Sequence, residues 1–387
     1  MPLRSWKYRL YPSKVQQESL DQHLYDCKNL WNSLLEYTIL EYEKTERFPT
    51  RSKLYLKTKG TRLHSQVAQN VADRLAKSLH GVVARKKVGK KAGFPRFKPI
   101  ERMKSFTYPQ FGFKLEDQLE LSNIGSVPIR KHRESQGTIK TLTIKKSPSG
   151  KWHAIFTTES ERKAAERNKM PEVGIDLGVE AFAYLSDGSK IENPRNLRLA
   201  EERLKKAQKR MSNKQRGSSK RAKARKAVAL SYERLTNRRR DFLHKTSRKL
   251  VNSYSFLALE NLNISGLAGG FLAKSVLDCS WAEFESMLRY KAEEAGCEVV
   301  LVDPAHTSQM CSNCGLIRKK SLAERWHECP CGASMPRDLN AAINILTRAT
   351  AGTVGSQACG EETTTGYNYN RQVSSGKREE AHGFSRG

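Results

Sequence analysis

Apolar residues recur with two different periods in the first hundred residues of the chain. Residues 4–11 alternate between apolar and polar, which predicts a short strand. Ser13 and Gln16 then fit a capping box, which marks the start of a helix. Two stretches follow in which apolar residues recur every three or four positions: Leu20, Leu24, Cys27, Trp31, Leu34 and Leu35, then Leu63, Val67, Val71, Leu75 and Leu79. We therefore predict two helices whose apolar faces serve packing.

The next stretches change period again. Residues 139–158 read as two strands around the turn Ser147-Pro148-Ser149-Gly150. The first half of the chain is thus predicted to consist of β-strands with a helical insertion. A polar stretch at 160–172 suggests a boundary, and apolar strand signals resume at Val173.

The second half combines strands with long helices. Residues 201–250 read as two helices joined by a turn at Gly217-Ser218-Ser219, and the apolar run from Phe256 reads as a strand that ends at Glu260. Leu339, Ala342, Ile343 and Leu346 form an apolar stripe at helical spacing. Residues 350–387 are rich in Gly, Ser and Thr without apolar periodicity, which predicts a disordered tail.

The charge of the chain points to a polyanionic partner. The 387 residues include 70 Lys+Arg and 40 Asp+Glu, a net charge of +30. Residues 201–250 hold 19 basic and four acidic residues, which is half of that net charge. Residues 85–104 hold nine basic residues with Phe94 and Phe97 between them. Cations for phosphates and aromatic rings for stacking favour nucleic acid over a membrane surface or a merely solvated face.

Other classes of protein are less consistent with this composition. The 37% apolar content excludes a wholly disordered or collagen-like chain. We expect an intracellular protein, because neither a signal peptide nor a spanning segment is visible. Eight cysteines are too few for a disulfide scaffold. We interpret Cys27, Cys279, Cys297 and Cys359 as ordinary core or tail residues.

Three carboxylates follow strand or helix signals at distant points of the chain. Asp176 lies between Gly174 and Gly178 on one face of a predicted strand, where the glycines would clear space around the carboxylate. Glu260 ends an apolar strand, and Asp338 lies in the first turn of a predicted helix. Taken one at a time, each residue has a purely structural interpretation. Asp176 could be a surface residue of an edge strand, Glu260 a charged residue that ends a strand, and Asp338 a charge that stabilises the start of a helix. Together they suit hydrolysis of phosphodiesters by two divalent ions, which an RNase H-like sheet could assemble.

Four cysteines are spaced as a metal site. Cys311 and Cys314 are followed by Cys329 and Cys331, and a glycine follows each pair. Such knuckles are typical of a structural Zn²⁺ with four thiolate ligands. Because the second pair is unusually tight, His327 remains a reserve fourth ligand in place of Cys329. Thiolates and carboxylates imply two separate metal systems.

At these residues the chain closely resembles TnpB, the RNA-guided nuclease family encoded by insertion sequences and related to compact type V CRISPR effectors. The matching stretches are GIDLGV (174–179), ALENLN (258–263), HTSQMCSNCG (306–315), CGASMPRDLNAAINIL (331–346), DFLHK (241–245), the opening YRLYPSKVQQ and GFPRFK. The likeness covers roughly residues 5–346. It departs at Pro336, where the family often has Asp, and in the tight second cysteine pair.

The resemblance implies a multidomain α+β and α/β fold. Its parts would be an N-terminal β-barrel or wedge (1–13 and 105–170), a helical recognition insertion (14–104), a RuvC nuclease of the RNase H fold (171–304, with the basic region 201–250), a zinc-binding insertion (305–335), a RuvC C-terminal helix (336–349) and the disordered tail (350–387). Asp176, Glu260 and Asp338 would hold two Mg²⁺, and Cys311, Cys314, Cys329 and Cys331 one Zn²⁺.

The resemblance also implies an activity and its partners. The expected function is cleavage of guide-complementary double-stranded DNA beside a short transposon-adjacent motif, directed by a structured guide RNA from the transposon end. We would place such a protein in the prokaryotic cytoplasm, acting at the nucleoid and without a membrane partner. The alternatives are a non-catalytic RNA-guided DNA-binding regulator, an accessory protein or strand transferase of transposition, and a generic zinc-containing RNA-binding protein.

Overall fold

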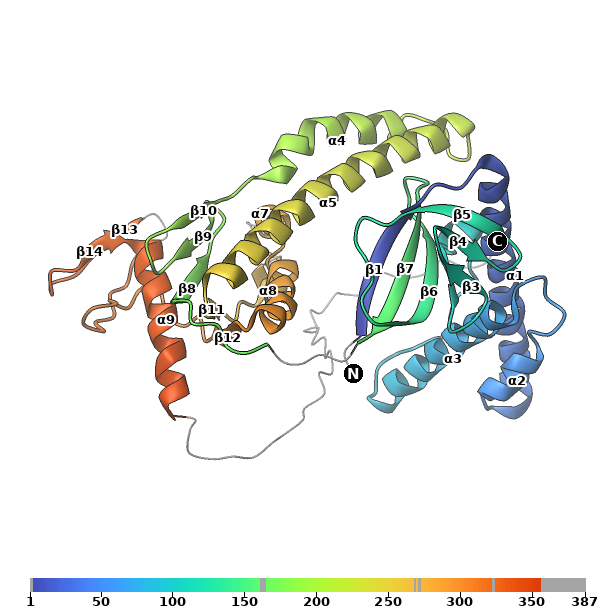
Figure 1. Cartoon of the computed structure of the whole chain (residues 1–387), viewed down its shortest axis with the longest axis horizontal. Coiled ribbons are helices and arrows are strands. Elements are labelled where there is room, and N and C mark those ends of the chain that lie inside the picture. Colours follow the sequence, from blue (N-terminus) through green and yellow to red (C-terminus); the bar gives the residue numbers. More distant parts are fainter. Residues whose placement is uncertain (1–2, 161–164, 268, 271–272, 322–323, 356–387) are drawn as a thin grey trace, which may run out of the picture.

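The computed structural model describes residues 3–160, 165–267, 269–270, 273–321 and 324–355 (Figure 1). Two units lie side by side, each built on its own sheet, and one long helix slants from within the left-hand unit to a place above the right-hand unit (Figure 1). The predicted multidomain α+β organisation is confirmed. Within the described ranges, no helix combines the length and apolar character that crossing a membrane requires.

The elements alternate in type along the chain. The strands are β1 (Leu3–Leu10), β2 (Ser105–Tyr108), β3 (Phe113–Leu115), β4 (Gln118–Leu121), β5 (Gly125–Arg130), β6 (Thr138–Lys146), β7 (Trp152–Glu159), β8 (Glu172–Leu177), β9 (Ala181–Leu185), β10 (Lys190–Glu192), β11 (Phe256–Glu260), β12 (Glu298–Val302), β13 (Trp326–Glu328) and β14 (Ser334–Pro336). The helices are α1 (Lys14–Thr45), α2 (Arg51–Leu56), α3 (Ser65–Lys87), the short 3-10 helix η1 (Ile100–Arg102), α4 (Asn196–Ser212), α5 (Ser219–Ser253), α6 (Ile264–Leu267), α7 (Ala273–Cys279), α8 (Trp281–Ala295) and α9 (Arg337–Gly355).

The first unit is a nearly closed antiparallel sheet with helices inserted between its first two strands. Its order is β2-β6-β7-β1-β5-β4-β3. Helix α1 begins at the predicted capping box, in which Ser13 and Gln16 bond each other's backbone. The predicted apolar faces of α1 and α3 are buried together with the inward side chains of β1. One core therefore joins the sheet and its helical insertion.

Part of the GFPRFK stretch packs against the helical insertion. The Phe94 ring lies 5.2 Å from that of Tyr42 and 5.6 Å from that of Phe48, in edge-to-face contacts. Lys98 lies over the Trp31 ring, with its ammonium 3.0 Å from the ring centroid. The Phe94 ring thus packs against other rings of the protein while 37% of the residue is exposed, and its contact with nucleic acid stays a prediction. Phe97 is 52% exposed.

The second unit is a mixed sheet in the order β10-β9-β8-β11-β12, with β8, β11 and β12 parallel. The side chains of its parallel strands alternate between two cores. Val173, Ile175, Leu257 and Leu259 face α5 and α8, whereas Phe256 and Ala258 face α9. The sheet is thus covered by helices on both sides. Because side chains two positions apart in a strand share a face, Glu260 lies on the α9 side with Ala258, and Asp176 lies on that side with Gly174.

Helix α9 approaches β8 closely because Gly174 has no side chain. A Cβ at this position would lie 2.0 Å from the carbonyl oxygen of Ala342. The sequence suggested that Gly174 clears space beside Asp176 for a ligand. In the structure, the backbone of α9 fills the space beside Gly174. Small Ala341 and Ala342 are both buried.

The predicted helix with its apolar stripe is α9, and the stripe is only partly buried. Ala342 is buried, but Leu339, Ile343 and Leu346 are only partly buried. The fully buried positions also include Asn340 and Asn344, which bond backbone groups of a neighbouring loop. The helix continues to Gly355, past residue 350 where the tail was predicted to begin. The rest of that predicted tail, 356–387, and Cys359 lie outside the described residues, whereas Cys27, Cys279 and Cys297 are buried as expected.

Gly174→Ala is expected to destabilise the fold by about 3 kcal/mol or more, because the added methyl group would overlap the α9 backbone. Chemical denaturation of the purified protein measures this change. Gly81→Ala is the matched control, since a Cβ at Gly81 meets nothing within 4 Å and the residue lies inside α3. An unchanged midpoint for Gly174→Ala would contradict the close packing of α9 on β8.

The two predicted basic helices are α4 and α5, joined by a turn at residues 213–218 (Figure 1). Arg221 closes this turn by donating to the carbonyl oxygens of Met211 and Lys214, at 3.1 and 2.6 Å. Part of the basic charge is used inside the protein. Arg239 lies 2.7 Å from Asp278 and Arg240 lies 2.7 Å from Glu283, so these arginines attach α5 to α7 and α8.

The remaining basic side chains of the hairpin lie on its surface. Those with high exposure in α4, the turn and the first half of α5 are Arg198, Arg203, Lys205, Lys206, Lys209, Arg210, Lys214, Arg216, Lys220, Lys223, Arg225, Lys226 and Arg234. Lys151, in the turn between β6 and β7, lies 2.9 Å from Glu233 of α5 and ties this helix to the first unit. The hairpin therefore presents a long positive surface that reaches both units.

Candidate functional site

Asp176 and Glu260 come from adjacent parallel strands in matching register. Leu259 of β11 pairs with Ile175 of β8, so the next residue of each strand, Glu260 and Asp176, lies at the same level. Strand neighbours are about 4.8 Å apart. Both side chains lie on the α9 face of the sheet, at the carboxyl end of its parallel strands, where α/β proteins often place their chemistry.

Asp338 reaches the same place from α9. Asp338 lies four positions before Ala342, which is about 6 Å along the helix. The backbone of Ala342 lies against Gly174. Asp176 lies two positions after Gly174, or about 6.6 Å along a strand. The close contact at Gly174 thus sets the level at which the first turn of α9 meets Asp176.

The three acidic side chains interact electrostatically. Burial and the negative charges of Glu260 and Asp338 raise the pKa of Asp176 to about 8, and the Arg337 guanidinium opposes this shift. Burial also raises the pKa of Glu260, against a hydrogen bond from Thr307 and the charge of Arg348. Arg337 lies 3.5 Å from a carboxylate oxygen of Asp338. The three carboxylates therefore concentrate negative charge at a site that is partly shielded from water.

This donor set fits a hard divalent cation. Carboxylate oxygens are the ligands that Mg²⁺ prefers, and a cation would relieve the repulsion that raises the pKa of Asp176. Among the described residues, the four cysteines alone form a group of three or more ligand residues within 4.8 Å. The carboxylates lie further apart than that, and each remains partly accessible. Such spacing suits cations that also keep water or phosphate oxygens as ligands.

Asp176→Asn is expected to stabilise the protein when divalent cations are removed. The folded-state pKa of about 8 lies far above the usual value for an Asp, so the folded state binds the proton more tightly. Wild-type stability should then fall as pH rises from about 4 to 8, and the variant should lack this loss. Thermal unfolding in cation-free buffer should show a Tm difference of about 3 °C or more at pH 8 that shrinks at pH 5. Exposed Asp117→Asn is the control, and parallel pH curves for wild type and Asp176→Asn would contradict the assignment.

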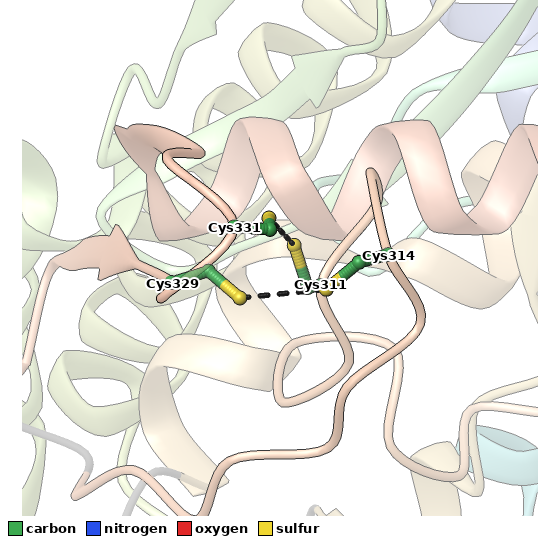
Figure 2. Close-up of side chains that lie close together, drawn as sticks. All are labelled: Cys311, Cys314, Cys329 and Cys331. Carbon is green, nitrogen blue, oxygen red and sulfur yellow. Dashed lines mark hydrogen bonds between the residues drawn. The ribbon is translucent and has the colours of Figure 1, made fainter.

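The four predicted cysteines converge on one point (Figure 2). The sulfur atoms of Cys311 and Cys331 are 3.7 Å apart, and those of Cys314 and Cys329 are 3.5 Å apart. A tetrahedral Zn²⁺ with Zn–S bonds of 2.3 Å needs sulfur atoms about 3.8 Å apart. The thiol cluster therefore has the dimensions of a closed, structural zinc site.

The histidine held in reserve is not part of this cluster. His327 lies on β13, is buried, and has its Nδ1 atom against the Lys320 ammonium. The backbone N–H of Ala333 and the side chain of Asn313 bond the Cys331 sulfur and lower the pKa of this thiol to about 6. The geometry thus favours Cys329 over His327 as the fourth ligand.

Three residues beside the carboxylates were missed by the sequence interpretation. Thr307 donates its hydroxyl to Glu260, and Asn340 and Asn344 bond the loop that carries Thr307. A usable signal was present, because two asparagines four positions apart interrupt an otherwise apolar helix. Buried amides at such spacing require partners, which here are backbone groups of residues 307–312.

Comparison with known proteins bears on the family. A model described as "Probable transposase" matches residues 155–269, and one described as "Cas12f1-like, TNB domain" matches residues 281–345. A protein of Streptomyces pristinaespiralis named "Putative RNA-guided DNA endonuclease" is 33% identical over 92% of this chain and 91% of its own length. The chain belongs to the TnpB family.

Other relatives of this TnpB-family chain agree with that placement. An Escherichia coli K12 protein named "Putative RNA-guided DNA endonuclease InsQ" is 28% identical over 94% of the chain and 96% of its own length. The CRISPR-associated endodeoxyribonuclease Cas12f1 of Sulfoacidibacillus thermotolerans is 29% identical over half of each chain. A solved complex of Cas12f1 with guide RNA and target DNA aligns with 89% of the chain and 99% of its own, at 15% identity and a TM-score of 0.35, and this likeness is too weak to bear on the placement.

A third family description differs from the structure. A model described as "Helix-turn-helix domain" matches residues 1–47. In this chain, residues 3–45 form strand β1 and the single long helix α1. Within the described part of that range, the segment contributes a sheet strand and a packing helix.

Proposed function

We propose that this protein is an RNA-guided DNA endonuclease whose cleavage centre consists of Asp176, Glu260 and Asp338. The observation that carries the proposal is the meeting of three carboxylates from β8, β11 and α9 on one face of the sheet, with their charges close enough to raise the pKa of Asp176. The names of the relatives, which include RNA-guided DNA endonucleases, support the same activity.

The centre would act as a RuvC-type, Mg²⁺-dependent hydrolase. Asp176, Glu260 and Asp338 would hold two Mg²⁺, which supply an activated water and stabilise the leaving oxygen when bound. The protein's own part is to fix the three carboxylates on rigid elements and to keep Arg337 beside Asp338. A non-catalytic regulator would have no need for this desolvated cluster of like charges, which destabilises the fold.

The remaining parts of the fold would serve nucleic-acid binding. We assign the nearly closed sheet (1–13 and 105–170) as the wedge, residues 14–104 as the recognition insertion, 171–304 with 336–349 as the nuclease unit, and 305–335 as its zinc-binding insertion. The exposed cations of α4 and α5 would bind the phosphate backbone of the guide RNA and its DNA target. The guide would derive from the transposon end, and cleavage would require a short adjacent DNA motif.

Sequencing the RNA that copurifies with the protein tests the guide directly. Expression together with the flanking transposon sequence should yield one discrete transcript from the transposon end, bound in near-stoichiometric amount. A mixture of cellular RNAs without a dominant species would contradict the proposal and favour a generic RNA-binding protein.

A further inference from the structure

The Glu260 carboxylate has a dedicated hydrogen-bond donor that lies outside the three acidic elements. Thr307, in the loop after β12, is 3% exposed and donates its hydroxyl to an oxygen of Glu260. The same hydroxyl lies 3.2 Å from the carbonyl oxygen of Pro304. A hydroxyl has one proton to give, and a carboxylate is the stronger acceptor. Thr307 therefore restrains the rotation of the Glu260 side chain.

Two buried asparagines of α9 hold Thr307 in place. The Asn344 amide donates to the carbonyl oxygens of Thr307 and Met310, at 2.9 and 2.7 Å. The Asn340 amide donates to the same Met310 oxygen at 2.7 Å and accepts from the Ser312 N–H at 2.9 Å. Both asparagines are at most 2% exposed. Because buried amides are costly without partners, these bonds fix the loop against the helix.

This arrangement connects both predicted metal systems. Asp338 lies in the first turn of helix α9, and Asn340 and Asn344 of the same helix bond the loop of residues 307–312. That loop carries both Thr307 and the zinc-cluster residue Cys311. The position of Glu260 relative to Asp338 is thus determined by one hydrogen-bonded chain and not by the sheet alone.

We propose that Thr307 is a positioning residue, held by Asn344, which fixes the Glu260 carboxylate for cation binding. This rests on the proposed function, since it assumes that the three carboxylates bind divalent cations. Outer-shell partners of metal ligands typically contribute about 10–100-fold to metal affinity. Removing the Thr307 hydroxyl should therefore weaken divalent-cation binding by a factor of this size, without loss of zinc.

The test compares Thr307→Val, which keeps the shape of the side chain, with Thr307→Ser, which keeps the hydroxyl. Each protein–RNA complex is stripped of loosely bound cations and titrated with Mn²⁺ while its thermal unfolding midpoint is followed. The half-saturating Mn²⁺ concentration should rise about 10–100-fold in Thr307→Val and stay within about 3-fold of wild type in Thr307→Ser. Equal values for wild type and Thr307→Val would overturn the proposal.

Asn344→Ala provides a second variant should Thr307→Val fail to fold, and it should weaken Mn²⁺ binding in the same direction. Zinc content, measured by mass spectrometry, reports whether the cysteine cluster remains intact in each variant. Asp176→Asn separates this inference from the proposed function. If wild type and Asp176→Asn respond equally to Mn²⁺, the carboxylate centre itself is misassigned. If Asp176→Asn abolishes the response while both Thr307→Val and Asn344→Ala leave it unchanged, only the role of Thr307 is wrong.

Discussion

Asp176→Ala is expected to reduce cleavage of guide-matched DNA by about 1,000-fold or more, a loss of about 4 kcal/mol of transition-state stabilisation. Asp176 lies centrally, next to Glu260 across the parallel strands and below the first turn of α9. Without its carboxylate, the remaining two acids would not hold two cations. Cleavage should be measured under single-turnover conditions with purified protein–RNA complex and a labelled duplex.

Glu260→Gln and Asp338→Asn should cause losses of similar order, because each removes one negative charge and leaves the packing of its element intact. Binding of guide RNA and of target DNA should be preserved in all three variants, as measured by filter binding. Asp117→Asn, an exposed acid of the first unit, should cleave like wild type. Undiminished Mg²⁺-dependent cleavage by Asp176→Ala would contradict the assignment of the centre.

Cys311→Ser is expected to eliminate the single equivalent of bound zinc and to unfold the segment around the thiol cluster. Cys311 is 1% exposed and its sulfur lies 3.7 Å from that of Cys331. Zinc binding to structural sites provides about 10–16 kcal/mol of apparent free energy in small zinc domains, so the local effect should be large. Because the same loop carries Thr307, we also expect DNA cleavage to fall by about 10-fold or more.

Zinc stoichiometry also decides between the two possible fourth ligands. Cys329→Ser should lose zinc as Cys311→Ser does, whereas His327→Gln should retain it, since His327 lies outside the cluster. Cys297→Ala is the control for loss of a buried thiol elsewhere. Retention of a full equivalent of zinc by Cys329→Ser, together with its loss in His327→Gln, would show that the histidine is the ligand.

Local patterns predicted the longest helices of this fold and several of its strands. The capping box at Ser13, the alternating strands and the basic hairpin each depend on residues close together in sequence, and the structure contains all of them. The acidic residues could be proposed because each lies at the end of such an element. Their register on adjacent strands could not, since it depends on parallel pairing of segments about 80 residues apart.

Contacts between distant segments account for the errors. Gly174 was interpreted as space for a ligand, but its partner is the backbone of Ala342, on a helix far along the chain. Asn340 and Asn344 went unnoticed because an amide in a helix acquires meaning only when its backbone partners are known. In each case the missing information was the identity of a neighbour.

Cleavage by a complex with a reprogrammed guide tests the central claim most directly. The guide segment of the copurified RNA is replaced, and the purified complex is given two duplexes that differ only in whether they match the new guide. The account predicts Mg²⁺-dependent cleavage of the matched duplex alone, beside the adjacent motif, and no cleavage by the Asp176→Ala complex. Equal cleavage of both duplexes, or cleavage that persists in Asp176→Ala, would contradict it.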